Sequence, residues 1–117
     1  KTHLAASILR EVVRRGEYDF AWVNVPEKQE QLAEYVERRF VVLDDLTGTV
    51  WSPAMARQLY ILINRRYEAE MPTVVTSNMG REQMGKMLGA DLVDRLYEMC
   101  SKKAVVLGGE SWRKEAI

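Results

Sequence analysis

Apolar residues in the first half of the chain follow two spacings, one typical of helices and one typical of buried strands. Between residues 4 and 14 they recur at helical spacing and Gly16 follows, which predicts a helix that ends at a glycine. The aromatic and β-branched run at 20–25 and the continuous apolar run at 40–43 predict two short strands. Residues 28–39 are polar with apolar side chains on one face, which predicts a surface helix between the strands.

The second half of the chain continues the same alternation. Ser52 and Pro53 suit the N-cap and the first position of a helix, and apolar spacing extends this helix to about Tyr67. Pro72 breaks the helix, and the run at 73–76 predicts a third strand. Two short helices and a last strand are predicted after it, at 81–88, 90–99 and 104–107.

Strands that alternate with helices predict a mostly parallel sheet covered on both faces, which is a three-layer α/β/α fold. The length of 117 residues, of which 47% are hydrophobic, suits a single compact domain. The 17 basic residues balance 17 acidic ones, so any contact with nucleic acid must be local. We therefore expect one domain over residues 1–117, and its net charge does not indicate a binding partner.

The cysteine content and the apolar runs exclude several classes of protein. The single cysteine, Cys100, cannot form an internal disulfide, and one cysteine with one histidine cannot build an ordinary structural zinc site. No apolar run approaches the roughly 20 residues of a membrane-spanning helix. These features predict a soluble, cytoplasmic protein with no membrane partner.

Candidate chemistry begins at the first predicted helix, which Lys1 and Thr2 open. A phosphate-binding P-loop ends in lysine and serine or threonine at a helix start, where backbone amides, the helix dipole and the ammonium group converge on phosphates. The glycine-rich turn and the strand that precede such a pair are absent from this sequence. By itself, the pair fits ordinary polar residues at the start of a helix better than it fits a P-loop.

Two predicted strands end in polar residues that suit one site. Asp44 and Asp45 follow the apolar run at 40–43, which is the form of a Walker B strand, where the first carboxylate helps to hold Mg²⁺ and the second orients the attacking water. A helix cap or turn is the alternative. The strand at 73–76 is followed by Asn78, an amide within reach of a γ-phosphate beside those carboxylates. Neighbouring strand ends therefore predict a nucleotide site.

Six short segments occur in one order along the chain: KTHLA at 1–5, VVLDDL at 41–46, NRRYE at 64–68, PTVVTSN at 72–78, DRL at 94–96 and GESWR at 109–113. Together they resemble the DnaC/DnaI-type helicase loaders and the IstB-like transposition ATPases of the AAA+ superfamily. The resemblance covers nearly the whole chain and implies a P-loop NTPase fold with ATP and Mg²⁺ as cofactors.

The resemblance implies a role for each residue of the nucleotide site. Lys1 corresponds to the lysine that binds the β- and γ-phosphates, and Thr2 to the hydroxyl ligand of Mg²⁺, whose surroundings Asp44 completes. Asp45 stands where most AAA+ proteins have glutamate, so we expect a slow ATPase. Asn78 corresponds to sensor 1, which positions water or the γ-phosphate; a strand-terminating turn residue is the alternative.

Two arginines correspond to residues that communicate beyond this site. Arg95 resembles the arginine finger, which acts in the site of a neighbouring subunit, so the resemblance implies self-association. The alternative for Arg95 is a salt bridge with Asp91 or Asp94. Arg113 resembles the sensor 2 arginine, which contacts the nucleotide from the lid side.

The segment at 46–70 corresponds to the region that lines a path for single-stranded DNA in helicase loaders, and Ser52 occupies a matching position. Basic and aromatic side chains for such a contact are present. Alternatively, two of the arginines favour the dipole at a helix C-terminus and the tryptophan packs inside. The candidates are Trp51, Arg57, Arg65, Arg66 and Tyr67.

Taken together, the motifs predict an ATP-binding helicase loader of the primosome, which acts with the replicative helicase on single-stranded DNA in DNA replication. An IstB-like transposition helper and a non-catalytic nucleotide-sensing adaptor are the alternatives. We also expect residues upstream of Lys1, because a P-loop sheet without its central strand should not fold. A further omitted segment is expected near 27–28, because residues 26–39 barely exceed the dozen or so that a parallel crossover needs.

Overall fold

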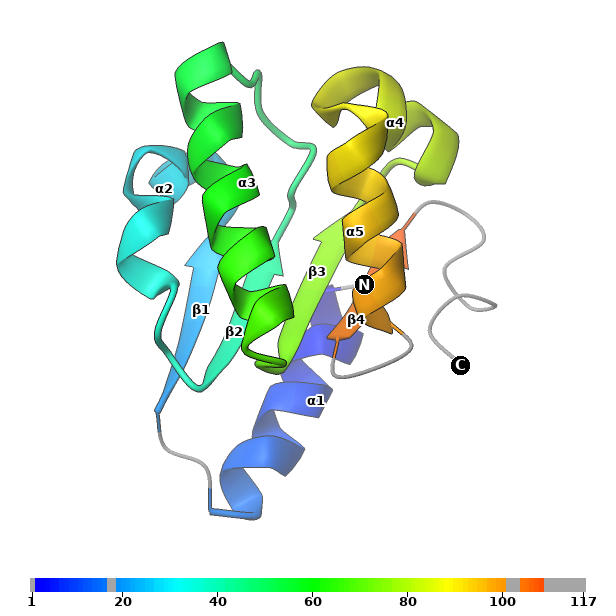
Figure 1. Cartoon of the computed structure of the whole chain (residues 1–117). Helices are drawn as coiled ribbons and strands as arrows, with labels where there is room; N and C mark the ends of the chain where they lie inside the picture. Colours follow the sequence, from blue (N-terminus) through cyan, green and yellow to red (C-terminus); the bar gives the residue numbers. More distant parts are fainter. Residues whose placement is uncertain (1, 17–18, 101–103, 109–117) are drawn as a thin grey trace.

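The computed structural model describes residues 2–16, 19–100 and 104–108 (Figure 1). Almost every element that the sequence predicts is found, within one or two residues of its predicted ends. In chain order the elements are α1 (Thr2–Arg14), β1 (Phe20–Asn24), α2 (Val25–Lys28), the 3₁₀-helix η1 (Gln29–Tyr35), β2 (Phe40–Asp44), α3 (Pro53–Glu68), β3 (Thr73–Ser77), α4 (Arg81–Leu88), α5 (Ala90–Cys100) and β4 (Ala104–Gly108).

The strands form one parallel sheet in the order β1-β2-β3-β4. The register pairs Asn24 with Asp44, and Leu43 with Val75. The carboxyl ends of β1, β2 and β3 therefore meet at one edge, where the arrowheads point in Figure 1. The predicted parallel sheet is confirmed, and it brings the polar residues after β2 and β3 together.

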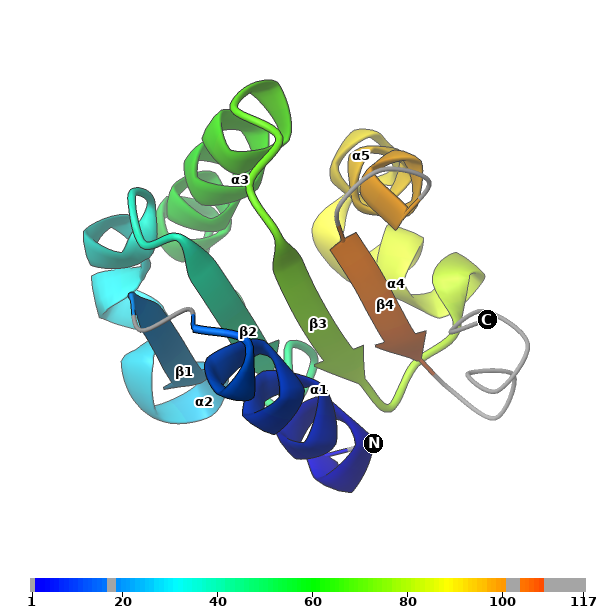
Figure 2. The same ribbon diagram turned by 90° about the horizontal axis from the view of Figure 1, so that it is seen from below.

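Helices cover both faces of the sheet, as Figure 2 shows from below. Because successive side chains of a strand point to opposite faces, Phe40 and Val42 pack with α1, whereas Val41 and Leu43 pack with α3 and α5. The three-layer α/β/α arrangement is thereby confirmed. No helix in the described ranges is long and apolar enough to cross a membrane.

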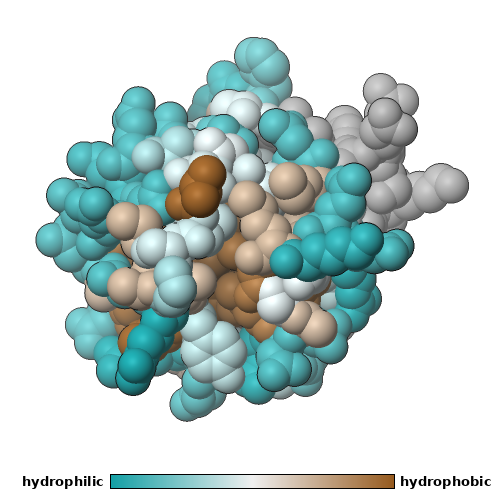
Figure 3. All heavy atoms as spheres, turned by 90° about the horizontal axis from the view of Figure 1, so that it is seen from above, coloured by the Kyte–Doolittle hydropathy of each residue, from teal (hydrophilic) through white to brown (hydrophobic). Residues whose placement is uncertain are grey.

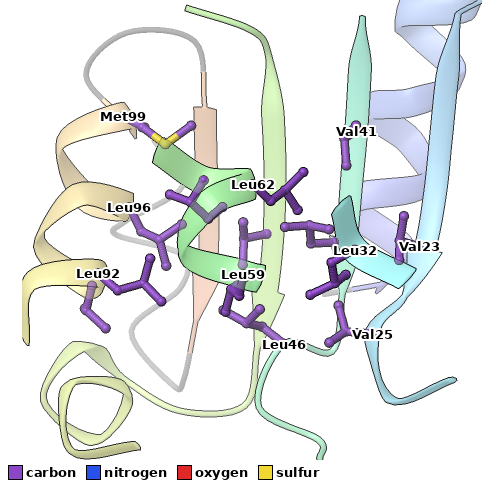
Figure 4. Close-up of a cluster of buried hydrophobic side chains, with 14 of the residues drawn as sticks. Val23, Val25, Leu32, Val41, Leu46, Leu59, Leu62, Leu92, Leu96 and Met99 are labelled. Atoms are coloured by element: carbon purple, nitrogen blue, oxygen red, sulfur yellow. The ribbon is translucent and has the colours of Figure 1, made fainter. Parts of the chain in front are cut away.

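The larger of the two apolar clusters lies between the sheet and α3 (Figure 4). Leu59 and Leu62 of α3, Leu96 of α5 and Leu32 of η1 are all buried. Each such leucine contributes roughly 1.5–3 kcal/mol by leaving water. This cluster fixes α3 and α5 against the sheet and leaves the carboxyl edge of the strands open to polar residues.

The segment between β1 and β2 differs from its prediction. The prediction of a surface helix over 28–39 is wrong. The chain instead forms the short α2 and then η1, with a non-helical kink at Gln31. The crossover from β1 to β2 has only residues 25–39, and the kink lets Leu32 reach the core within that length. The omitted segment expected near 27–28 stays a prediction.

The sheet is continuous across β3 and β4. Their register runs from Thr73 opposite Ala104 to Ser77 opposite Gly108. The residues expected upstream of Lys1 stay a prediction.

Candidate functional site

A polar pocket of about 200 Å³ lies where β2 and β3 end and α1 begins. The structure brings four of the predicted site residues into it from three separate segments of the chain. Figure 3 looks onto the end of the molecule toward which the strands point, where hydrophobic side chains show at the centre of the face and hydrophilic ones surround them. The pocket is lined by Thr2, Asp44, Asp45, Thr76, Ser77 and Asn78.

Asp44 is the last residue of β2 and its side chain is held on two sides. Its Oδ1 accepts a hydrogen bond from the Thr2 hydroxyl at 3.1 Å and another from the Thr76 hydroxyl at 2.8 Å. Hydrogen bonds to an ionised acceptor are stronger than those between neutral groups. One donor comes from α1 and the other from β3, so the carboxylate is fixed by two neighbouring elements, and neither bond uses Oδ2.

Asp45 turns the chain sharply away from the strand. Its φ is 62°, in the left-handed region that residues with a Cβ rarely adopt. Its amide donates to the Thr76 hydroxyl at 2.7 Å, and the amide of Leu46 donates to the Thr76 carbonyl at 2.8 Å. A Cβ at Gly48 would lie 2.2 Å from Asp45 Oδ2, so only glycine leaves room there for this carboxylate.

Residues after β3 complete the pocket. Asn78 is exposed at its rim. The buried hydroxyl of Ser77 lies 2.8 Å from that of Thr47 and accepts a hydrogen bond from the amide of Met79 at 3.0 Å. These bonds tie the loop after β2 to the loop after β3, so the two strand ends form one unit.

The start of α1 adds backbone donors to the pocket. The helix begins at Thr2, runs for 13 residues, and has no acidic residue in its first turn. Its first amides have no partner within the helix and the helix dipole is positive at this end. A phosphate beside Thr2 would therefore meet backbone donors, while Asp44 and Asp45 face the same pocket with negative charge.

The donor set fits Mg²⁺ that arrives together with phosphates. Magnesium is usually held by one or two carboxylates, with substrate phosphates and water as the other ligands. Thr2 and Asp44 supply a hydroxyl and a carboxylate that already contact each other. In the described part of the chain, no group of three or more histidine, cysteine, aspartate and glutamate side chains could hold a metal by itself.

Two predicted site residues, Lys1 and Arg113, lie outside the described residues. Their assignments as the P-loop lysine and the sensor 2 arginine stay predictions.

Arg95 lies away from the pocket, half-buried on α5. Its Nη1 donates to Asn64 Oδ1 at 3.0 Å, and its guanidinium carbon lies 4.3 Å from the centre of the Tyr67 ring. Asp94, which was one alternative partner, pairs instead with Arg81 at 3.1 Å. Arg95 is thus placed by α3 through an amide and an aromatic ring.

Arg66 is a correction to the predicted DNA contacts. Its side chain is 0% exposed, so it cannot reach a nucleic acid on the surface. Its guanidinium donates to the Thr73 hydroxyl at 2.8 Å, to the carbonyl of Pro72 at 2.7 Å, to that of Val36 at 3.0 Å, and to that of Arg38. Burial lowers the pKa of Arg66 to about 10, which leaves it charged at neutral pH.

The other DNA candidates have different surroundings. The Ser52 hydroxyl accepts from the amide of Met55 at 3.2 Å and caps α3. Trp51 donates from its indole nitrogen to the carbonyl of Leu46 at 3.0 Å and packs against the core. Arg65 is exposed. DNA binding by Ser52 and Arg65 stays a prediction.

Sequence reasoning assigned no role to two residues that shape the pocket, Thr76 and Gly48. Thr76 lay inside a quoted motif, and its hydroxyl one residue from the end of a strand could have marked it as a partner for the acidic pair. Gly48 lies three residues after Asp45, a spacing at which glycine indicates a tight turn. Neither signal predicts which atoms meet.

A parallel sheet whose strand ends present carboxylates and an amide beside the start of a helix is the arrangement expected of a nucleotide-binding α/β protein. A family model described as IstB-like ATP binding protein matches residues 1–116, and the chain belongs to this family.

The fold is similar to a solved structure, the crystal structure of the DnaC helicase loader. The TM-score is 0.75 at 20% sequence identity, over 90% of this chain and 70% of that chain. A search of curated proteins finds no match. The predicted resemblance to the IstB-like family is confirmed by the family model, and the predicted fold by the similarity to the DnaC structure.

Proposed function

We propose that this chain is the core of an ATPase that binds ATP with Mg²⁺ in the pocket between α1, β2 and β3, and that it acts as a helicase loader in DNA replication. One observation carries the proposal: Thr2, Asp44, Asp45 and Asn78 line one pocket in a member of an ATP-binding family.

Each residue has a task in this proposal. Thr2 and Asp44 hold Mg²⁺, which would neutralise phosphate charge when bound, and Lys1 binds the β- and γ-phosphates. Asp45 takes up a hydrogen bond from the attacking water and Asn78 orients the water or the γ-phosphate. Arg113 contacts the nucleotide from the lid side.

The proposed hydrolysis is slow because Asp45 reaches less far than a glutamate. Its backbone is turned into the left-handed region and its carboxylate lies over Gly48. A general base must come within about 2.6–3.2 Å of the water that it deprotonates, directly or through one further water. The Asp45 side chain is shorter than that of a glutamate and is held against the loop, so it comes within this distance of the water less often.

Self-association is proposed through Arg95. In the described part of the chain its guanidinium contacts an amide and an aromatic ring and no carboxylate. Its positive charge is therefore not neutralised by an ion pair there, and it suits a phosphate in the site of a neighbouring subunit.

Single-stranded DNA is the proposed ligand of the outer face of α3. Arg57, Tyr60 and Arg65 are exposed there, and Ile61 between them is 36% exposed. Basic side chains that follow a backbone and an aromatic ring that stacks on bases are the usual means of binding single strands. The similarity in fold to the DnaC helicase loader supports a replicative helicase as the partner.

Two other functions follow from specific observations. The family description favours an IstB-like role as a helper ATPase in transposition, which shares the same nucleotide site. A non-catalytic nucleotide-sensing adaptor is favoured by Asp45 in place of glutamate. Three results distinguish these functions. A helicase loader deposits helicase on single-stranded DNA, a transposition helper stimulates a transposase, and a sensing adaptor binds ATP without hydrolysing it.

The first test of the proposal is ATP binding by the full-length protein, measured by fluorescence with a labelled ATP analogue. Lys1→Ala should abolish measurable binding, because the ammonium group on the phosphates is lost. Lys86→Ala is the matched control, since this lysine is exposed on α4 outside the pocket. Equal affinity of the two variants would contradict the nucleotide site.

The loader role is tested separately. A replicative helicase from the same organism is mixed with the protein, ATP and single-stranded DNA, and helicase bound to the DNA is quantified. We expect ATP-dependent loading that Lys1→Ala removes. If the protein binds ATP but does not change the amount of helicase on the DNA, the loader role is wrong and the proposed ATP site is unaffected.

A further inference from the structure

The hydroxyl of Thr76 contacts both acidic residues of the pocket. Thr76 is 3% exposed on β3 and lies one residue before the end of this strand. Its Oγ1 donates to Asp44 Oδ1 at 2.8 Å and accepts from the amide of Asp45 at 2.7 Å. One small side chain therefore joins the last residue of β2 to the first residue of the loop that follows it.

The donor and acceptor capacity of a hydroxyl accounts for this arrangement. A threonine hydroxyl has one hydrogen to donate and two lone pairs to accept with. At Thr76 the hydrogen goes to a carboxylate and a lone pair takes an amide hydrogen, and the carbonyl of the same residue accepts from the amide of Leu46 at 2.8 Å. Three consecutive residues, 44–46, are thus bonded to Thr76.

Asp45 needs such support because of its backbone. Its φ of 62° is uncommon for a residue with a Cβ, and such conformations persist where the surroundings fix them. Two features accommodate Asp45: the hydrogen bond from its amide to the Thr76 hydroxyl, and the absence of a side chain at Gly48, which leaves room for its carboxylate. If the hydroxyl is lost, the amide loses its partner and the turn loses one of these supports.

We propose that Thr76 is a positioning residue that couples the two carboxylates of the nucleotide site. It fixes the side chain of Asp44 and the backbone of Asp45 at once. Asp44, which is proposed to hold Mg²⁺, and Asp45, which is proposed to contact the attacking water, therefore keep one relative position. This inference rests on the proposed function, because it assumes that Mg²⁺ and ATP bind in this pocket.

The test uses three variants of the full-length protein. Thr76→Val keeps the shape and removes the hydroxyl, and Thr76→Ser keeps the hydroxyl. Thr73→Val is the matched control: Thr73 is on the same strand, is equally buried at 1% exposure, and its hydroxyl accepts from Arg66 at the opposite end of β3. ATP affinity is measured with Mg²⁺ and again with EDTA, beside the midpoint of urea unfolding.

The expected result separates positioning from stability. The factor by which Mg²⁺ raises the affinity for ATP should be about 10-fold or more smaller in Thr76→Val than in the unmodified protein. This is the usual cost of removing a residue that orients a metal ligand. The affinity of Thr76→Val in EDTA should stay unchanged, and Thr76→Ser should restore most of the gain. Thr73→Val should lower the unfolding midpoint and leave the gain intact.

Two other outcomes would overturn different statements. If the unmodified protein shows a gain from Mg²⁺ and Thr76→Val shows the same gain as Thr73→Val, the positioning role is wrong and the nucleotide site remains. If the unmodified protein binds no ATP, the proposed function is wrong and the positioning role falls with it.

Discussion

Two adjacent arginines show how differently one residue type is used at neighbouring positions of α3. Arg65 is exposed, whereas Arg66 is buried and its guanidinium donates to four backbone carbonyls and to the hydroxyl of Thr73. A buried charge is tolerated only when its donors are satisfied. Arg66 thereby joins the end of η1 to the start of β3.

This difference predicts opposite outcomes for the same substitution. Arg66→Met should lower the free energy of unfolding by about 2–4 kcal/mol, because it leaves buried carbonyls without donors. Arg65→Met should change it by less than about 0.5 kcal/mol, since the side chain is in water. Urea unfolding followed by circular dichroism measures both, and similar values for the two variants would contradict the buried network.

At the scale of one element, α3 carries the clearest local signals in the chain. The hydroxyl of Ser52 caps the helix through the amide of Met55, and Pro53 occupies the first turn. The same helix carries the exposed face that we propose for single-stranded DNA. Substitutions at Ser52 can therefore separate a structural role from a binding role.

We expect Ser52→Ala to lower the free energy of unfolding by about 1 kcal/mol, because the cap is lost. Ser52→Asp should keep the stability, since aspartate also caps and complements the helix dipole. If Ser52 lies on the DNA path, Ser52→Asp should nevertheless weaken binding to a single-stranded oligonucleotide, by charge repulsion. Binding equal to that of the unmodified protein, measured by fluorescence anisotropy, would remove Ser52 from the path.

At the scale of the whole molecule, the proposed nucleotide pocket and Arg95 belong to different parts of the fold. The pocket lies at the carboxyl edge of the sheet, and Arg95 is packed between α5 and α3. A residue that is remote from the pocket of its own chain can act on hydrolysis only through another subunit or by stabilising the fold. These two routes can be distinguished.

Arg95→Ala should leave ATP binding near normal and remove the hydrolysis that rises with protein concentration, because the charge is missing from the neighbouring site. Asn64→Ala is the matched control, since it deletes the hydrogen bond to Arg95 within the chain and keeps the guanidinium. Steady-state ATPase rates over a range of protein concentrations give the result. Equal losses in both variants would assign Arg95 a structural role.

The sequence by itself determined the parallel α/β order, the strand ends and the acidic pair after β2. These features depend on spacing, propensity and chain order, which are local properties. The family followed from short motifs in one order, and the matching family model confirms it. Asp44, Asp45 and Asn78 could be named because strand ends of a parallel sheet meet at one edge, and Thr2 because it opens the first predicted helix and corresponds to the P-loop hydroxyl.

Only the tertiary structure decided which atoms meet and which side chains are buried. The kink in η1 was not predicted from the sequence. The Arg66 bonds to Val36 and Arg38 and the two bonds of the Thr76 hydroxyl join segments 28 or more residues apart along the chain. Their positions are set by how the helices pack on the sheet. A local pattern contains no information on such distances, so the same serine, threonine or arginine fits a surface or a core until the chain is folded.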